Sequence, residues 1–212
     1  MTKPILYDYW KSSASYRIRI AMNLKGIEYE SRQVDLTKGE QTGAENMARN
    51  PQGLVPQLMI DGLSLTQSLP IIEYLDQTRP EVPLIPEDPR ERHKVRVIAA
   101  AVSMEMAPVM NLRVAKKAVA WSGDAKGMKD WMHEWMPMGL AAVEELISAG
   151  RDGGFCHRDT PTLADCCLIP QLYNARRWEV DLEPYPIIRA VEEHCGELNA
   201  FQQAHPEAVG AP

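Results

Sequence analysis

The sequence predicts two architectures in one chain: a small α/β domain over residues 1–79 and an all-helical domain over residues 90–212. Three observations lead to this prediction. Short strand-like runs alternate with helical periodicity in the first eighty residues, and the segments after residue 90 are helical in pattern. Between them, residues 80–89 read Pro-Glu-Val-Pro-Leu-Ile-Pro-Glu-Asp-Pro. Proline this dense can continue neither a helix nor a central strand, so we interpret the segment as an interdomain linker.

The first domain is expected to follow the order βαβ-α-ββ-α. The expected strands cover residues 5–9, 29–34, 57–60 and 63–66, and the expected helices cover 15–25, 44–49 and a segment that Ser68 would cap. Gly26 stands where a C-terminal helix glycine is favoured, and Asp61-Gly62 is a dipeptide typical of a hairpin. This order predicts a mixed sheet with helices on its faces, in a thioredoxin-like layout.

The second domain is expected to consist of helices alone. They cover residues 90–119 with a bend near Pro108, then 126–149, then a helix that continues to about 177, and a final pair over 185–204. Thr162 and Asp165 have the spacing of a capping box, in which each side chain bonds the backbone amide of the other. The helix that ends near residue 177 is therefore expected to begin at Thr162.

Composition excludes several classes of function. The 212 residues are 45% hydrophobic and 25% charged, which permits a buried core and argues against disorder. The net charge of -6 lacks the basic excess of a nucleic-acid-binding protein. The 4 cysteines form no C-x-x-C pair and the 5 histidines lack ligand spacing, so no metal is expected. No leader and no apolar run of about 18 residues is found, which predicts a cytoplasmic protein without a membrane partner.

The segment from Lys11 to Arg17 joins the first strand to the first helix and is rich in serine. In a thioredoxin-like layout this loop holds the redox dithiol, and the absence of cysteine here excludes a dithiol oxidoreductase. Hydroxyls and backbone amides at the positive end of a helix suit an anion brought in from outside, such as a thiolate. An equally open alternative is a serine-rich turn in which Ser15 only caps the helix.

Two further dipeptides point to the same edge of the sheet. Val55-Pro56 precedes a strand, where a cis-proline would present the backbone of Val55 for strand-like pairing with a peptide. The alternative is an ordinary proline at the start of a strand. Gln67-Ser68 lies at the next helix N-terminus, a natural site for a carboxylate. Three such features at one edge are less expected by chance than each alone.

At this level of detail the sequence resembles the zeta-class glutathione transferases, which include the maleylacetoacetate and maleylpyruvate isomerases. The motifs that carry the resemblance span essentially the whole chain: Lys11-Ser-Ser-Ala-Ser-Tyr-Arg-Ile-Arg-Ile-Ala21, Asn50-Pro51, Val55-Pro56, Asp61-Gly62, Gln67-Ser-Leu69, Thr160 to Asp165, Asn174 to Leu182 and Tyr185-Pro186. The resemblance implies the glutathione transferase fold, a thioredoxin-like domain followed by a helical bundle. It also implies a homodimer and glutathione as cosubstrate.

The resemblance also implies a role for individual residues. Ser12 would polarise the glutathione thiol, and the start of the first helix would cradle the sulfur with Ser12, Ser13, Ala14, Ser15, Tyr16 and Arg17. The rest of glutathione would bind Val55 (cysteinyl backbone), Gln67 and Ser68 (γ-glutamyl carboxylate) and Gln41 (glycyl end), with Asn111 facing the site from the helical domain. Arg177 would bind a substrate carboxylate, with Lys11 and Arg113 as further candidates.

Two positions depart from the family pattern. Ala14 stands where the serine motif often has cysteine, and Ala107 stands where relatives place glutamine or histidine toward the site. Both changes remove polar groups near the sulfur. They leave open which substrate the chain acts on.

The leading hypothesis is therefore a glutathione-dependent cis–trans isomerase of a maleyl keto acid in aromatic compound catabolism. Addition of a thiolate to the conjugated double bond would permit rotation, and elimination would release the trans isomer. An enzymatic alternative uses the same thiolate for conjugation or for dehalogenation of α-halo acids. A non-enzymatic alternative is a glutathione-binding dimerisation protein, against which the presence of Ser12, Gln67 and Ser68 argues.

Overall fold

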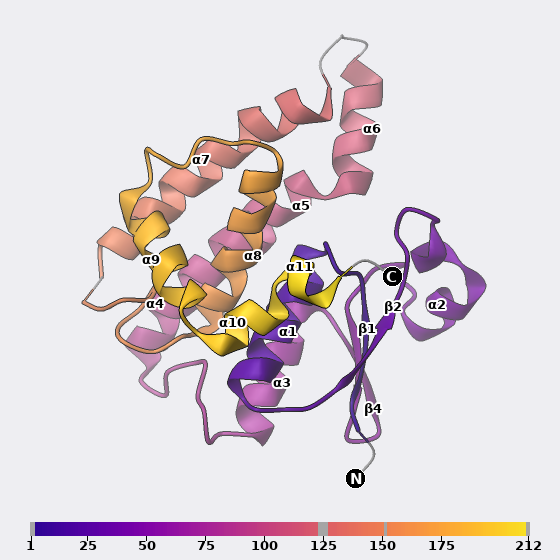
Figure 1. Cartoon of the computed structure of the whole chain (residues 1–212), viewed down its shortest axis with the longest axis horizontal. Helices are drawn as coiled ribbons and strands as arrows, with labels where there is room; N and C mark the ends of the chain where they lie inside the picture. Colours follow the sequence, from indigo (N-terminus) through magenta and orange to yellow (C-terminus); the bar gives the residue numbers. More distant parts are fainter. Residues whose placement is uncertain (1–2, 123–126, 151, 211–212) are drawn as a thin grey trace. The chain divides into compact units, whose positions relative to one another are not determined.

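The computed structural model describes residues 3–122, 127–150 and 152–210, which are coloured along the sequence in Figure 1. They belong to two compact units. The first unit comprises Met1–Leu84 together with Glu197–Pro212, and the second comprises Ile85–Gly196. The chain passes from the first unit to the second within the proline-rich segment 80–89.

The first unit contains a four-stranded mixed sheet in the order β2-β1-β3-β4. Its strands are β1 (Ile5–Asp8), β2 (Glu30–Gln33), β3 (Gln57–Ile60) and β4 (Leu63–Thr66). β1 pairs with β2 in parallel and with β3 antiparallel, and β3 and β4 form the hairpin that Asp61-Gly62 predicts. The helices are α1 (Ser13–Leu24), α2 (Ala44–Arg49) and α3 (Ser68–Thr78), with a short 3-10 turn, η1, at Glu40–Thr42.

Helices α1 and α3 lie on one side of the sheet and α2 lies on the other (Figure 1). Apolar side chains of the sheet and of α1 and α3 are fully buried, among them Leu6, Ile18, Leu58, Ile71 and Ile72. The order of elements and the burial pattern confirm the thioredoxin-like domain that the sequence predicts.

The beginnings of α1 and α3 differ from the sequence prediction by one or two residues. Helix α1 is capped by Ser12, not Ser15, because Ser12 has extended backbone angles and its side chain accepts a hydrogen bond from the Ser15 amide. Helix α3 begins at Ser68, and its N-cap is Gln67, whose side chain makes no capping bond. Gly26 follows α1 with a φ of 63°, as expected for a glycine after a helix.

The end of the chain packs on helix α1. The segment contains α10 (Asn199–Ala204) and α11 (Pro206–Val209). Arg19 Nε donates to the Ala204 carbonyl at 2.9 Å, and Asn23 Nδ2 donates to the Ala200 carbonyl at 3.0 Å. The prediction that this segment belongs to the helical domain is therefore wrong, because helical periodicity does not show which core a helix joins.

The second unit is helical throughout its regular elements. These are α4 (Pro89–Ala100), the π-helical segment η2 (Ala101–Met106), α5 (Ala107–Met110), α6 (Leu112–Ser122), α7 (Met128–Ser148), α8 (Leu163–Arg177) and α9 (Pro186–Gly196). The long helix expected over residues 90–119 is therefore interrupted. It contains a π-helical turn and breaks at Asn111, which has extended backbone angles, not at Pro108. Lys126, the expected start of the next helix, lies outside the described residues.

Within the described residues, no helix alone has both the length and the apolar composition needed to cross a membrane. One pair of helices, Pro89–Met110 and Leu112–Ser122, meets the criterion only when taken together across a bend of 47°.

The capping box at the start of α8 is present as predicted. The buried Asp165 carboxylate accepts hydrogen bonds from the Thr162 amide at 2.7 Å and the Thr162 hydroxyl at 2.9 Å. Its other oxygen accepts from the Cys156 amide at 2.8 Å, which ties the preceding loop to the helix. The Thr162 hydroxyl in turn accepts from the Ala164 amide.

We expect Thr162→Ala to lower the free energy of unfolding by about 1–2 kcal/mol, because it removes the cap and one donor to a buried carboxylate. Thr162→Ser keeps the hydroxyl and should lose much less. Urea unfolding measures both changes, with Thr160→Ala at a neighbouring exposed position as the control. Equal stability of Thr162→Ala and the control would contradict this role.

Candidate functional site

The turn between β1 and α1 holds Ser12 half-buried at the helix N-terminus. The Ser12 amide donates to the Tyr9 carbonyl at 2.8 Å, and the Ser12 hydroxyl oxygen accepts from the Ser15 amide at 3.3 Å. A serine hydroxyl carries one donor and two acceptor sites. Because the capping bond uses one acceptor site, the hydroxyl proton remains able to donate to an external anion.

The first turn of α1 adds further positive character. The amides of Ser13 and Ala14 precede the first intrahelical hydrogen bond, and no acidic side chain lies in this turn. Ser15 is fully buried, and its hydroxyl has no hydrogen-bond partner among the described residues. The geometry therefore supports an anion at this helix end.

Val55 precedes β3, and its peptide bond to Pro56 is cis, as the sequence analysis anticipated. The Val55 side chain packs in a cluster with Tyr9, and Trp10 lies against this cluster, so Val55 adjoins the turn that leads to Ser12. In the described part of the chain, neither the amide nor the carbonyl of Val55 makes a backbone hydrogen bond. Both groups suit pairing with an extended peptide.

Gln67 and Ser68 lie at the start of α3. Gln67 has a φ of 69°, a conformation that is uncommon outside glycine and that concentrates at binding sites. Its side-chain amide donates to Gln52 Oε1 at 2.7 Å. Ser68 is buried, and its hydroxyl accepts from Arg17 Nη1 at 3.2 Å, which leaves the Ser68 proton to donate. The first unit thus brings Arg17 and Ser68 together at a second helix N-terminus.

Two other residues predicted from the family motif have different surroundings. The Tyr16 ring is buried and packs edge-on against His205 at 6.0 Å, so its side chain belongs to the core between α1 and the chain end. Gln41 lies in η1, where its carbonyl accepts from Asn46 at 2.8 Å. The Gln41 Oε1 atom is buried without a hydrogen-bond partner in the described structure.

The candidates of the second unit lie on α6 and α8. Arg177 is exposed at the end of α8 and has no carboxylate partner among the described residues, whereas the neighbouring Arg176 pairs with Glu192. Arg113 is exposed on α6 and likewise has no acidic partner in the part described. The Asn111 side chain accepts from the Arg113 amide at 3.0 Å and so caps α6. Its role toward glutathione stays a prediction.

Lys11 belongs to the first unit, next to Ser12. Its Nζ atom lies 4.1 Å from the centre of the Trp10 ring, a cation–π geometry. No acidic partner of Lys11 occurs in the described residues, so its charge remains available to an anion.

Arg19 is not among the predicted site residues, although its side chain is fully buried in the first unit. Its guanidinium donates to both Asp8 carboxylate oxygens at 2.8 and 2.9 Å and to the Trp10 carbonyl at 2.9 Å. A charged residue between Ile18 and Ile20, with an aspartate ending the first strand, is a signal that the sequence contains.

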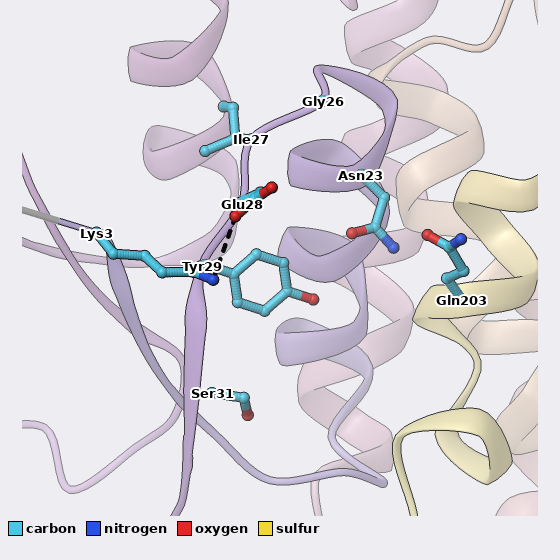
Figure 2. Close-up of a pocket in the computed structure, with 8 residues that line it drawn as sticks. All are labelled: Lys3, Asn23, Gly26, Ile27, Glu28, Tyr29, Ser31 and Gln203. Atoms are coloured by element: carbon cyan, nitrogen blue, oxygen red, sulfur yellow. Dashed lines mark hydrogen bonds and ion pairs between the residues drawn. The ribbon is translucent and has the colours of Figure 1, made fainter.

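One cavity of about 470 Å³ opens on the first unit, and Figure 2 shows its lining side chains. It is lined by Lys3, Asn23, Gly26, Ile27, Glu28, Tyr29, Ser31 and Gln203. Burial raises the pKa of the Tyr29 phenol to about 12. None of the predicted site residues lines this cavity, so it is separate from the Ser12 site. Among the described residues, no cluster of three or more His, Cys, Asp or Glu side chains is arranged for a metal ion.

Comparison with known proteins identifies the family. Residues 3–77 match the family described as glutathione S-transferase, N-terminal domain. The maleylacetoacetate isomerase of Rhizobium meliloti is 50% identical over 204 residues, 96% of each chain. The chain belongs to the zeta-class glutathione transferases. The maleylpyruvate isomerase of a Ralstonia species is 43% identical over 205 residues, covering 96% of this chain and 97% of the relative.

Solved structures of this family agree with the fold. A holo maleylpyruvate isomerase, described as a bacterial zeta-class transferase, superposes with a TM-score of 0.92 at 43% identity, covering 96% of this chain and 97% of that one. Maleylacetoacetate isomerase from Anaeromyxobacter dehalogenans, with glutathione bound in its active site, gives 0.88 at 42% identity, covering 99% of this chain and 98% of that one. The glutathione transferase fold predicted from the sequence is confirmed.

The donors present in this chain fit glutathione. The tripeptide offers a thiol, a peptide backbone and a terminal α-carboxylate, each of which needs a different partner. The Ser12 hydroxyl with the α1 amides suits the sulfur, the Val55 backbone suits the peptide, and Ser68 at the α3 N-terminus suits the carboxylate.

Proposed function

We propose that this chain is a glutathione-dependent cis–trans isomerase that converts a maleyl keto acid, maleylacetoacetate or maleylpyruvate, to the fumaryl form. Two observations together carry the proposal. The Ser12 hydroxyl at the N-terminus of α1 uses an acceptor site for its capping bond and can still donate its proton. The chain is 50% identical to a maleylacetoacetate isomerase over 96% of its length. Of the two substrates we favour maleylacetoacetate as the first to test, because the relative that is 50% identical carries that name.

Glutathione, when bound, supplies the nucleophilic sulfur whose reversible addition lets the substrate double bond rotate. Ser12 donates a hydrogen bond to the sulfur and favours its charged form, since a bond to the charged form lowers a thiol pKa. The amides at the start of α1 contribute in the same direction. The Val55 backbone orients the tripeptide, and Gln67 and Ser68 hold its α-carboxylate.

The substrate is a diacid at neutral pH, so its binding needs cationic partners. Arg177, Arg113 and Lys11 carry charges that no acidic side chain neutralises in the described parts of the two units. An arginine fork matches a carboxylate in a bidentate manner, and we therefore assign Arg177 as the main substrate anchor.

The test is an absorbance assay of maleylacetoacetate and of maleylpyruvate, each with and without glutathione. Turnover that requires glutathione supports the isomerase. Chloride release from dichloroacetate without isomerisation would indicate a dehalogenase, and glutathione binding with neither reaction would indicate the non-enzymatic binding protein. Either result would overturn the proposal.

We also propose that the chain works in the cytoplasm as a homodimer. Support comes from the resemblance to the zeta-class family, which implies a homodimer. Light scattering of the purified protein measures the oligomeric state, and a monomer at micromolar concentration would contradict the dimer.

A further inference from the structure

The Arg19 guanidinium bonds to three parts of the first unit: strand β1, the turn that follows it and the end of the chain. Its side chain and that of Asp8 are both 0% exposed, and they form an ion pair at 2.8 Å. The same guanidinium donates to the Trp10 carbonyl at 2.9 Å and to the Ala204 carbonyl at 2.9 Å. A buried ion pair adds little net stability after desolvation, but its directional bonds fix the groups around it.

The turn held by Arg19 is the one that presents Ser12. The backbone of Trp10 is held at both of its peptide groups, because its amide donates to Gln33 Oε1 at 3.1 Å and its carbonyl accepts from Arg19 at 2.9 Å. Two residues later the Ser12 amide donates to the Tyr9 carbonyl at 2.8 Å. The position of the Ser12 hydroxyl therefore depends on the hydrogen bonds that hold the backbone of Trp10.

We propose that Arg19 is a positioning residue. Through its hydrogen bond to the Trp10 carbonyl it orients the Ser12 hydroxyl toward the glutathione sulfur. Its hydrogen bond to the Ala204 carbonyl makes this orientation depend on the position of the chain end. The inference rests on the proposed use of glutathione by this site. It does not require that the substrate be a maleyl keto acid.

The link to the chain end follows from the same side chain. Asn23, one helical turn further along α1, donates to the Ala200 carbonyl at 3.0 Å, so α1 has two polar contacts with α10. Only the Arg19 contact continues to the turn before Ser12. A displacement of α10 would thus move the Arg19 guanidinium and, with it, the turn that precedes Ser12. Displacements of about 1 Å near a reacting group can lower the rate by as much as 10²-fold.

The experiment compares Arg19→Lys with Lys25→Met in the full-length chain. Lysine at position 19 keeps a charge beside Asp8 but cannot reach three acceptors at once. Lys25 is the matched control, because its buried ammonium, 1% exposed, also joins Asp76 at 2.9 Å and the Arg79 and Val82 carbonyls. It does so at the opposite end of α1 from Ser12.

Both variants should lower the unfolding midpoint. Only Arg19→Lys should raise the pKa of the bound glutathione thiol, by about one unit, a roughly tenfold change in the acid dissociation constant of the thiol. Glutathione affinity from titration calorimetry should change less than about twofold, because the Val55 and Ser68 contacts are kept. Ultraviolet absorbance of the thiolate against pH measures the shift without any second substrate.

An unchanged thiol pKa in Arg19→Lys, or an equal rise in Lys25→Met, would overturn the positioning role. If Arg19→Lys does not fold, Gln33→Ala releases the neighbouring peptide group, at the Trp10 amide, and should raise the thiol pKa to a smaller extent; no rise would overturn the inference. A wild-type protein that binds glutathione with a lowered thiol pKa but isomerises no maleyl substrate would overturn the proposed function and leave this inference standing.

Discussion

Replacing Ser12 with alanine should lower turnover of the maleyl substrate by about 10²–10³-fold, the usual effect of removing one donor to a reacting anion. The Ser12 oxygen already accepts from the Ser15 amide at 3.3 Å, so its proton is the group that we expect to donate to the sulfur. Glutathione affinity should change only a few-fold, because the proposed role of Ser12 is to act on the sulfur, whereas Val55, Gln67 and Ser68 are proposed to hold the tripeptide. Steady-state kinetics and titration calorimetry measure the two effects separately.

Ser12 also caps α1, so the alanine variant should lose about 1 kcal/mol of stability in addition. Ser12→Thr keeps both the cap and the hydroxyl and should retain most activity, and Ser13→Ala tests whether the neighbouring hydroxyl contributes. Among these three variants, the pKa of the bound thiol should rise only in Ser12→Ala. An unchanged thiol pKa together with full activity would remove Ser12 from the mechanism and assign its role to Ser13, Ser15 or the backbone amides.

The sequence predicts those parts of the fold that depend on local chemistry. Asp61-Gly62 predicts the β3–β4 hairpin because both residues adopt positive φ there, 53° and 77°. Thr162 and Asp165 predict the start of α8 for a similar reason, since their bonds join residues three apart. The start of α1 is less certain from sequence, because Ser12 and Ser15 are equally good caps. The bond from the Ser12 amide to Tyr9 favours the earlier one.

Features that depend on distant partners could not be predicted in this way. Arg19 is 185 residues from Ala204, so neither its burial nor the docking of the chain end follows from periodicity. The same limit applies to the adjacent pair Arg176 and Arg177. Sequence alone does not show that Arg176 pairs with Glu192, which leaves Arg177 as the one of the two without an acidic partner in the described structure.

Because Arg177 has no acidic partner in the described structure and Arg176 has one, we expect replacement of Arg177 to cause the second large effect, a loss of affinity for the substrate. Arg177→Ala should weaken binding of the maleyl substrate by about 1.5–3 kcal/mol, the contribution typical of a hydrogen bond to a charged group. Glutathione affinity should stay nearly constant, since the groups assigned to glutathione on the first unit are unchanged. Arg177→Lys should recover only part of the loss, because a point charge cannot reproduce the bidentate fork.

Arg176→Ala is the matched control on the same helix turn. Its guanidinium already bonds Glu192, and exposed ion pairs contribute about 0–1 kcal/mol, so this variant should bind both ligands almost normally. Kinetics with each substrate varied separately, together with glutathione calorimetry, distinguish the outcomes. Equal losses for both ligands in Arg177→Ala would indicate a structural role for Arg177. Full activity in that variant would contradict the diacid assignment, because an uncharged electrophile needs no cationic anchor.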